Sequence, residues 1–333
     1  MRIGIMGLSE GHVLEMLASA KKAANAQLVG VVEPIDRFYE RACQDMAIPR
    51  YASLDEMIAE ARPELILEGV NHAQKVELVE KAAAAGIHLL LDKPLCRNLD
   101  DFQRIKAAIT QSNIQVSMWF TSRSFRPFVA LRKQILAGEL GELVSFISTH
   151  PHRLRANHPK WYTDQNVYSG TFVDLACHGV DQIRWLSGAE YVGVHALAST
   201  IKRHQDSTYE GFNDSVQASF RLSSGAIATV TADWLIPPTS PYWGDTRFII
   251  MGTKGCAHLR AYADNHVLVL SDEHGVQEIP IEEHEVTFVQ DMIDSLENGS
   301  DLFVSTEDVL AVAQASLMAE ESIKRGGEYL KIE

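Results

Sequence analysis

The chain has 333 residues, of which 46% are hydrophobic and 22% charged, and its formal net charge at pH 7 is -14. A chain of this length exceeds one ordinary hydrophobic core, so two domains are expected. The acidic excess, without a stripe of lysine and arginine, argues against nucleic acid and anionic membranes as partners. No stretch approaches the ~20 apolar residues that a membrane span needs.

The N-terminus and the cysteines indicate a cytoplasmic protein. Met1 leads directly into a strand pattern, which is not the pattern of a secretory signal peptide. The four cysteines are scattered and form no Cys-x-x-Cys pair, so neither a structural zinc site nor a redox dithiol is predicted. Reduced thiols are the simplest interpretation. Cys177, beside His178, is better explained as a small buried side chain than as a reactive one.

Residues 1–120 alternate between strand patterns and helical patterns. This alternation predicts an α/β domain with a doubly wound parallel sheet, the Rossmann architecture that binds dinucleotides. Ser53 with Glu56 forms a capping-box signal, and Asn98 is a second helix-capping residue. Strands are predicted at residues 2–6, 27–32, 64–68, 87–91 and 114–120, with the main helices at 13–24, 36–46, 73–85 and 98–110.

Residues 121–333 have a different pattern, which predicts an α+β domain. Most of its strands follow one another without helices between them, which is typical of a large, mostly antiparallel open sheet with helices on one face. As an alternative for the end of the chain, the last helix packs on the first domain. Strands are predicted at 192–199, 215–222, 226–231, 247–251, 257–261, 267–271 and 276–279, and helices at 127–137, 170–186, 283–298 and 306–325.

A cofactor turn is predicted between the first strand and the first helix. A dinucleotide turn has the pattern G-x-G-x-x-G, and this chain has Gly7-x-Ser9-x-x-His12 with an additional Gly11. Ser9 is small and can donate a hydrogen bond to phosphate. His12 is bulkier than glycine, so helix and strand are expected to pack less closely. By itself this motif is weak, and an ordinary strand-to-helix turn is an equally good interpretation.

Glu33, at the end of the second strand, strengthens the cofactor interpretation. A carboxylate at this place can accept both ribose hydroxyls and repels a 2′-phosphate, which favours NAD over NADP. Arg37, one helical turn later, could soften that exclusion. The alternative is that Glu33 is a solvated carboxylate at a strand end.

Three side chains are candidates for the reacting groups. Lys93 follows a buried strand and precedes Pro94, so its backbone is expected to be fixed, and its ammonium can stabilise a developing alkoxide. Asp174 and His178 are four residues apart and therefore share one helix face. His178 is the natural general base, and Asp174 can hold substrate or orient the imidazole. The alternatives are a loop lysine, a carboxylate near a helix N-terminus and a core histidine. Asp181 is expected to make a structural hydrogen bond or ion pair, for which Arg184 at the i+3 position is a candidate partner.

These segments resemble the glucose–fructose oxidoreductase / inositol dehydrogenase / MocA (Gfo/Idh/MocA) family over essentially the whole chain. The glycine turn, Asp92-Lys93-Pro94 and the helix from Ser169 to His178 are similar to the family's three motifs. The segment around Asn71 resembles the family's stretch along the cofactor. Ser9 and His12 stand where the family has glycines, and Asp92 stands where it has glutamate.

The resemblance implies an NAD-dependent dehydrogenase of a sugar, polyol or derivative, with Lys93, Asp174 and His178 as its catalytic residues. It also implies a homodimer or homotetramer formed through the open sheet of the second domain. The cofactor residues expected from the turn, the strand ends and the resemblance are Gly7, Ser9, Glu10, Gly11, His12, Glu33, Asn71 and Lys93.

Candidate substrate contacts lie before the Asp174 helix and after the first domain. They are Arg123, His152, Trp161 and Tyr162, because aromatic faces suit sugar C–H surfaces while His and Arg suit hydroxyls or a carboxylate. Although several histidines lie in this region, no acidic partner has ligand spacing, so no metal site is predicted.

Two other functions remain open at this point. One is a redox-neutral enzyme in which bound NAD takes and returns a hydride during elimination or epimerisation. The other is a non-catalytic NAD-binding sensor, which the altered glycine turn would permit but which the intact catalytic trio argues against.

Overall fold

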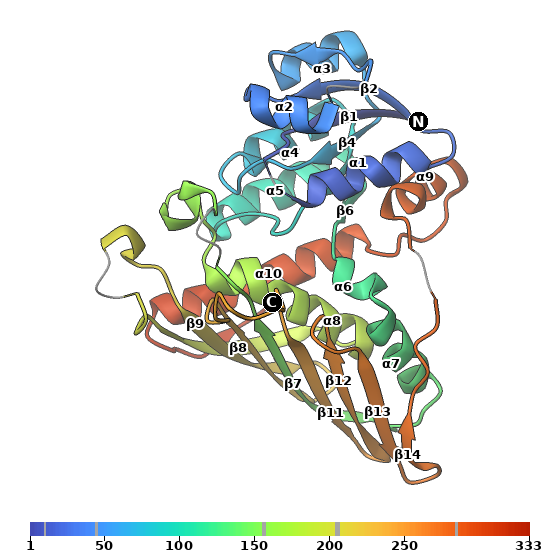
Figure 1. Cartoon of the computed structure of the whole chain (residues 1–333), viewed down its shortest axis with the longest axis vertical. Helices are drawn as coiled ribbons and strands as arrows, with labels where there is room; N and C mark the ends of the chain where they lie inside the picture. The colour runs from blue at the N-terminus through green and yellow to red at the C-terminus, as the bar shows by residue number, and fades with distance from the viewer. Residues whose placement is uncertain (10, 44–45, 155–157, 204–206, 284–285) are drawn as a thin grey trace. The chain divides into compact units, whose positions relative to one another are not determined.

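The structure is a computed structural model of the chain that describes residues 1–9, 11–43, 46–154, 158–203, 207–283 and 286–333 (Figure 1). It divides into two compact units. The first unit contains Met1–Trp119 and Val286–Leu310, and the second contains Phe120–Glu285 and Ala311–Glu333. The segment Val286–Leu310, which the sequence places with the second half, therefore belongs with the first unit.

The first unit is built on a six-stranded parallel sheet with the strand order β3-β2-β1-β4-β5-β6. The order reverses between β1 and β4, and ligands of such sheets bind beside the carboxyl ends of the strands at this reversal. The strands are buried because helices cover the sheet, which explains their continuous apolar runs. The strands are β1 (Arg2–Met6), β2 (Gln27–Val32), β3 (Arg50–Tyr51), β4 (Leu65–Glu68), β5 (His88–Leu91) and β6 (Val116–Met118).

Two helices of the first unit begin at capping residues that the sequence predicts. The Ser53 hydroxyl accepts a hydrogen bond from the Glu56 N–H, and the Asn98 side chain accepts one from the Asp101 N–H. Helix α1 packs against α9 (Figure 1). The helices are α1 (His12–Lys22), α2 (Asp36–Cys43), α3 (Leu54–Ala61), α4 (Lys75–Ala84), α5 (Leu99–Ser112), α9 (Phe288–Asn298) and the first turn of α10 (Thr306–Lys324).

The second unit is built on a nine-stranded sheet in the order β14-β13-β12-β11-β7-β10-β9-β8-β15, in which only β7 and β10 pair in parallel. The predicted fold class is thereby confirmed. The sequence did not predict β7, which lies in the middle of this sheet. The strands are β7 (Leu143–Pro151), β8 (Tyr191–Ser199), β9 (Ser215–Leu222), β10 (Ile227–Asp233), β11 (Thr246–Gly252), β12 (Gly255–Ala261), β13 (His266–Ser271), β14 (Gly275–Glu278) and β15 (Leu330–Lys331).

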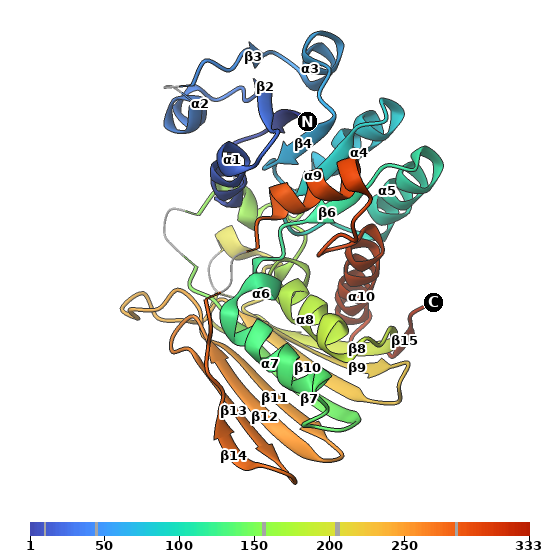
Figure 2. The same cartoon turned by 90° about the vertical axis from the view of Figure 1, so that its right-hand side faces the viewer.

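The nine-stranded sheet carries its helices on one face, as Figure 2 shows for α7 and α8. The side chains of the strands therefore alternate between buried and exposed. Phe146, Phe248 and Ile250 are buried, whereas Ile147 is 48% exposed and Ile249 is 36% exposed. The helical segments of this unit are α6 (Thr121–Ser124), α7 (Arg126–Leu136), the 3₁₀ turns Lys160–Thr163 and Ser207–Tyr209, the π-helical turn Phe172–Ala176, α8 (Cys177–Ser187) and the rest of α10.

Candidate active site

The turn after β1 has the backbone that a dinucleotide requires. Gly7 has φ +80°, and a Cβ there would lie 2.6 Å from Val70 Cγ1 and 2.9 Å from the Gly69 carbonyl oxygen. Any other residue would therefore be strained at this position. By contrast, a Cβ on Gly11 would meet nothing within 4 Å, so the turn is open at that residue. This combination of a tight bend and an open approach fits a bound pyrophosphate.

The close packing of helix on strand comes from Gly69 at the end of β4, which the sequence analysis did not single out. A Cβ on Gly69 would lie 2.5 Å from Val13 Cβ in α1, and Val13 is fully buried. The expectation of looser packing because of His12 is therefore wrong. In the usual pattern the third glycine allows the helix to approach the strand closely. In this chain Gly69, which directly follows the neighbouring strand β4, allows it instead. The only indication of this close approach in the sequence is that Gly69 directly follows a buried strand.

Glu33 lies at the end of β2, beside the turn, and holds the turn in place. Its carboxylate accepts hydrogen bonds from the Leu8 N–H (2.7 Å) and the Ile35 N–H (2.8 Å), and the residue is only 4% exposed. Each carboxylate oxygen has a second lone pair and can accept a further bond. Glu33 is thus a structural anchor of the turn, and it is not the solvated strand-end carboxylate that the alternative interpretation supposed.

The other predicted cofactor residues of the first unit lie at the same edge of the sheet. The Ser9 hydroxyl donates to the Gly69 carbonyl (3.1 Å). Asn71 closes a turn after β4, because its side-chain oxygen accepts from the Ala73 N–H (3.0 Å). Glu10 lies outside the described residues. The β1–β4 switch point therefore brings together Gly7, Ser9 and Asn71, as the strand-end argument predicted.

Lys93 follows β5 and is half-buried, and the peptide before it is clamped by a buried ion pair. Lys75 Nζ lies 2.9 Å from a carboxylate oxygen of Glu68, and the two side chains are 1% and 0% exposed. Lys75 also donates to the Asp92 carbonyl (2.5 Å), and Glu68 accepts from the Asp92 N–H (3.1 Å). The backbone of Asp92 is therefore held at both its polar groups, which fixes the start of the loop that carries Lys93.

The sequence analysis missed both members of this pair. A lysine on the apolar face of α4 and a glutamate at the end of a buried strand were the signals, because such charges are rarely buried without a partner.

His12, the first residue of α1, pairs with Asp92. His12 Nδ1 lies 2.9 Å from Asp92 Oδ1, and the side chains are 33% and 3% exposed. The Asp92 carboxylate raises the pKa of His12. Burial alone would raise the pKa of Asp92, but His12, Lys75 and Lys93 together hold it at about 2. Two of the departures from the family pattern thus contact each other.

In the second unit, Asp174 lies in the π-helical turn that precedes α8 and is 1% exposed. Its Oδ2 accepts a hydrogen bond from the Tyr168 hydroxyl (3.0 Å), and that hydroxyl accepts one from Trp234 Nε1 (3.3 Å). Burial, followed by the Asp174 charge, raises the pKa of Tyr168 far above its ordinary value, so the phenol stays a donor. The chain around Asp174 enters the helix through Gly170, whose φ is +96°.

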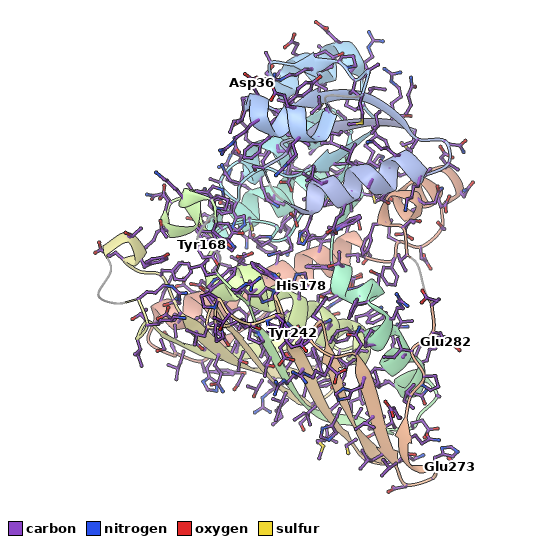
Figure 3. All side chains as sticks on the ribbon, in the orientation of Figure 1. Asp36, Tyr168, His178, Tyr242, Glu273 and Glu282 are labelled. Atoms are coloured by element: carbon purple, nitrogen blue, oxygen red, sulfur yellow. The ribbon has the colours of Figure 1, made fainter. Side chains whose placement is uncertain are left out.

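His178 lies in the first turn of α8 and is 9% exposed. Its ring packs edge-on against Phe120, with a centroid distance of 6.0 Å. Both His178 and Tyr168 lie on the helix-covered side of the nine-stranded sheet (Figure 3). The next residue, Gly179, makes room for His150 of β7, since a Cβ there would lie 2.3 Å from His150 Nε2. Burial lowers the pKa of His150 to about 3, so this second histidine is neutral.

Arg123 and Asp181 form a buried ion pair. Arg123 Nη2 lies 2.6 Å from Asp181 Oδ1, Nε donates to both carboxylate oxygens, and the residues are 1% and 0% exposed. The structural ion pair predicted for Asp181 is therefore present with Arg123, while Arg184 binds Glu190 (2.6 Å). This ion pair gives Arg123 a structural role beneath α8, which speaks against the predicted substrate contact.

The other predicted substrate residues join an aromatic cluster around Tyr168. Tyr162 and Trp161 lie 5.1 and 6.4 Å from the Tyr168 ring, measured between centroids, and Trp161 lies 4.4 Å from Tyr162. His152 lies 6.0 Å from Trp234. The Tyr168 hydroxyl therefore links this aromatic cluster to the Asp174 carboxylate. The sequence analysis named neither Tyr168 nor Trp234, and an aromatic residue just before the Gly170 turn was the only signal.

Glu320, on α10, is a buried carboxylate behind the helix that carries Asp174. Glu320 accepts a hydrogen bond from the Phe172 N–H, and its Oε2 has no hydrogen-bond partner among the described residues. Its carboxyl group occupies the space that a Gly170 side chain would need, since a Cβ there would lie 2.7 Å from Glu320 Cδ. Burial raises the pKa of Glu320 to about 7, against the opposing effects of Lys324 and the Phe172 N–H.

The titration of Glu320 predicts a pH-dependent stability. In the unfolded chain this carboxyl ionises near its ordinary value of 4.5. The folded state keeps the proton up to about pH 7, so stability falls as pH rises between these values. Glu320→Gln keeps an acceptor for Phe172 and should raise the free energy of unfolding at about pH 8 by about 3 kcal/mol. Thermal unfolding at about pH 5 and about pH 8 measures this, with Glu321→Gln as the matched control. An unchanged pH slope in Glu320→Gln would contradict the assignment.

Two further findings bear on the class of protein. In the described ranges, no helix has both the length and the apolar content required to cross a bilayer. The same ranges contain no group of three or more His, Cys, Asp or Glu side chains that could hold a metal ion.

A parallel sheet with a dinucleotide turn at its switch point, followed by an α+β unit with a buried Asp/His helix, defines a two-domain nicotinamide-dependent oxidoreductase. Residues 1–120 match the model of the oxidoreductase family with an NAD-binding Rossmann fold, and residues 128–258 match the Gfo/Idh/MocA C-terminal domain. The chain belongs to the Gfo/Idh/MocA family.

Named relatives and solved structures are similar over most of the chain. The chain is 22% identical to scyllo-inositol 2-dehydrogenase (NAD(+)) of Bacillus subtilis, covering 97% of this chain and 93% of that protein. It is 27% identical to myo-inositol 2-dehydrogenase of Thermotoga maritima, covering 83% and 79%. The structure of levoglucosan dehydrogenase with NADH and levoglucosan superposes with a TM-score of 0.85 at 20% identity, covering 100% and 99%.

Proposed function

We propose that this protein is an NAD-dependent dehydrogenase that acts on a CH–OH group of a sugar, polyol or derivative. The main observation behind this proposal is that the Asp174 carboxylate accepts a hydrogen bond from Tyr168, which lies at the centre of an aromatic cluster. The same chain also has a turn that fits a dinucleotide. Carboxylates bind hydroxyls, and aromatic faces pack against sugar C–H surfaces. The two named relatives, both inositol dehydrogenases, support this substrate class.

The first unit would hold the cofactor. The backbone at Gly7 and Gly11, with Ser9, would accept the pyrophosphate, while Glu33 would bind the ribose hydroxyls through its remaining lone pairs. Asn71, at the end of β4, would lie along the dinucleotide. NAD, when bound, supplies the hydride acceptor, so the protein residues have only to bind the substrate and manage its proton.

The reacting groups would divide the work among three side chains. His178 would take the hydroxyl proton as general base, and the Lys93 ammonium would stabilise the negative charge that develops on the oxygen. Asp174, oriented by Tyr168, would position the substrate. Trp161, Tyr162 and His152 would contact the ring of the substrate.

Glu33 is expected to set the preference for NAD over NADP. Glu33→Gln removes the negative charge and keeps an acceptor for one of the two backbone N–H groups that Glu33 binds, so NAD should weaken and NADP should tighten relative to NAD, changing the ratio of their dissociation constants by at least about tenfold. Isothermal titration calorimetry with both cofactors measures this. An equal loss for both would mean that Glu33 acts only through the Leu8 N–H.

Turnover distinguishes the proposed reaction from its rivals. Net formation of NADH during a screen of inositols, aldoses and their lactones supports a dehydrogenase. Conversion of substrate without net NADH would indicate a redox-neutral reaction, and NAD binding without conversion would indicate a sensor.

We also propose that the enzyme is cytoplasmic and forms a homodimer or homotetramer, and the helix-free face of the nine-stranded sheet supports this assembly. Exposed apolar side chains on neighbouring strands are in register there: Ile147 lies opposite Ile249, and Ile227 and Met251 both lie opposite Ser145. A contiguous apolar patch of this kind is usually covered by another protein surface.

A further inference from the structure

The His12–Asp92 pair has a feature that its sequence positions do not reveal. Asp92 Oδ1 contacts Nδ1 of the ring at 2.9 Å, so Nδ1 carries a proton and donates it to the carboxylate. The other ring nitrogen, Nε2, bonds to no described residue, and it is not among the buried atoms that lack a partner. Nε2 is therefore open to solvent beside the turn.

We propose that the His12–Asp92 pair, which stands where the usual pattern has its third glycine, is an anion contact: His12 donates a hydrogen bond from Nε2 to a pyrophosphate oxygen of the dinucleotide, and cofactor affinity falls when the ring loses its proton. This inference rests on the proposed NAD-binding function and specifies one pH-dependent contact within the cofactor site.

The chemistry of imidazole gives this contact its pH dependence. With Nδ1–H directed to Asp92, a neutral ring presents a lone pair at Nε2, which repels a phosphate oxygen. The imidazolium presents an N–H there, which is the group that an anion requires. The pyrophosphate of NAD does not titrate near neutrality, so the transition would belong to the protein.

The charged groups around the ring favour the protonated form. Asp92 raises the pKa of His12 most, burial and Lys93 lower it, and Glu15 on α1 raises it. The net direction is upward. Asp92 is itself kept ionised by its neighbours, because Lys75 and Lys93 also lower the pKa of that carboxyl. The surroundings of the pair thus favour the imidazolium over the neutral ring.

The test is the dissociation constant of NAD, measured by calorimetry on the full chain between about pH 6 and about pH 9. The wild type should lose about tenfold to a hundredfold in affinity across the range, the worth of one charge-assisted hydrogen bond. The midpoint should coincide with the pKa of His12, measured by NMR on the cofactor-free protein. In Asp92→Asn the midpoint should move to lower pH.

Two variants separate the charge from the space that the ring fills. His12→Gln should bind NAD at the weak, high-pH level of the wild type throughout, and His12→Gly, which restores the third glycine of the pattern, should also lose the pH dependence. A wild-type affinity that does not change with pH, or a pH dependence that persists in His12→Gln, would overturn the inference while leaving the proposed function intact. Failure of NAD to bind at any pH would overturn the proposed function itself.

Discussion

Lys93→Met should lower kcat by about a hundredfold to a thousandfold while changing the dissociation constant of NAD by less than about threefold. The ammonium is proposed to act only when negative charge develops on the substrate oxygen, so its loss affects the transition state much more than the ground state. The peptide before Lys93 is fixed by Glu68 and Lys75, and methionine fills similar volume, so the loop should keep its conformation.

Steady-state kinetics and calorimetry on the same preparation measure both quantities. Lys22→Met, on the exposed surface of α1, is the matched control and should leave both unchanged. Equal activity of Lys93→Met and the wild type would remove Lys93 from the mechanism. A parallel loss of NAD binding would instead assign Lys93 to the cofactor.

Lys75→Met should lower the free energy of unfolding by about 3–5 kcal/mol. The substitution leaves the Glu68 carboxylate buried without its counter-ion and also removes the hydrogen bond to the Asp92 carbonyl. The exposed ion pair of Lys81 with Asp55 provides the comparison, since its loss in Lys81→Met should cost less than about 1 kcal/mol.

Differential scanning calorimetry of the full chain measures the difference between the two lysine variants. The double variant Glu68→Leu/Lys75→Met should recover much of the lost stability, because two apolar side chains leave no buried charge. A Lys75→Met protein no less stable than Lys81→Met would mean that the buried pair contributes little and that Asp92 is held by other contacts.

The sequence was sufficient for the order of most of the elements. The strands Gln27–Val32 and Ser215–Leu222 were predicted to the residue, because buried β-branched runs and alternating patterns are local properties. The Ser53 and Asn98 caps were also predicted, since capping involves only residues three apart. The three motifs were enough to identify the family.

β7 shows where local pattern is insufficient. Its apolar Val144 and Ile147 are exposed while its polar Ser148 and His150 are buried, so apolar and polar side chains do not follow burial. The strand is recognisable only because β10 and β11 pair with it on either side.

The sequence by itself determined which residue types stand at the strand ends and in the Asp174 helix, and hence the class of chemistry. Only the tertiary structure decided their partners: His12 with Asp92, Lys75 with Glu68, Arg123 with Asp181, and Gly69 against Val13. The reason is physical. Propensity and periodicity depend on neighbours along the chain, whereas ion pairing and close backbone approach depend on which strands and helices the fold places next to each other.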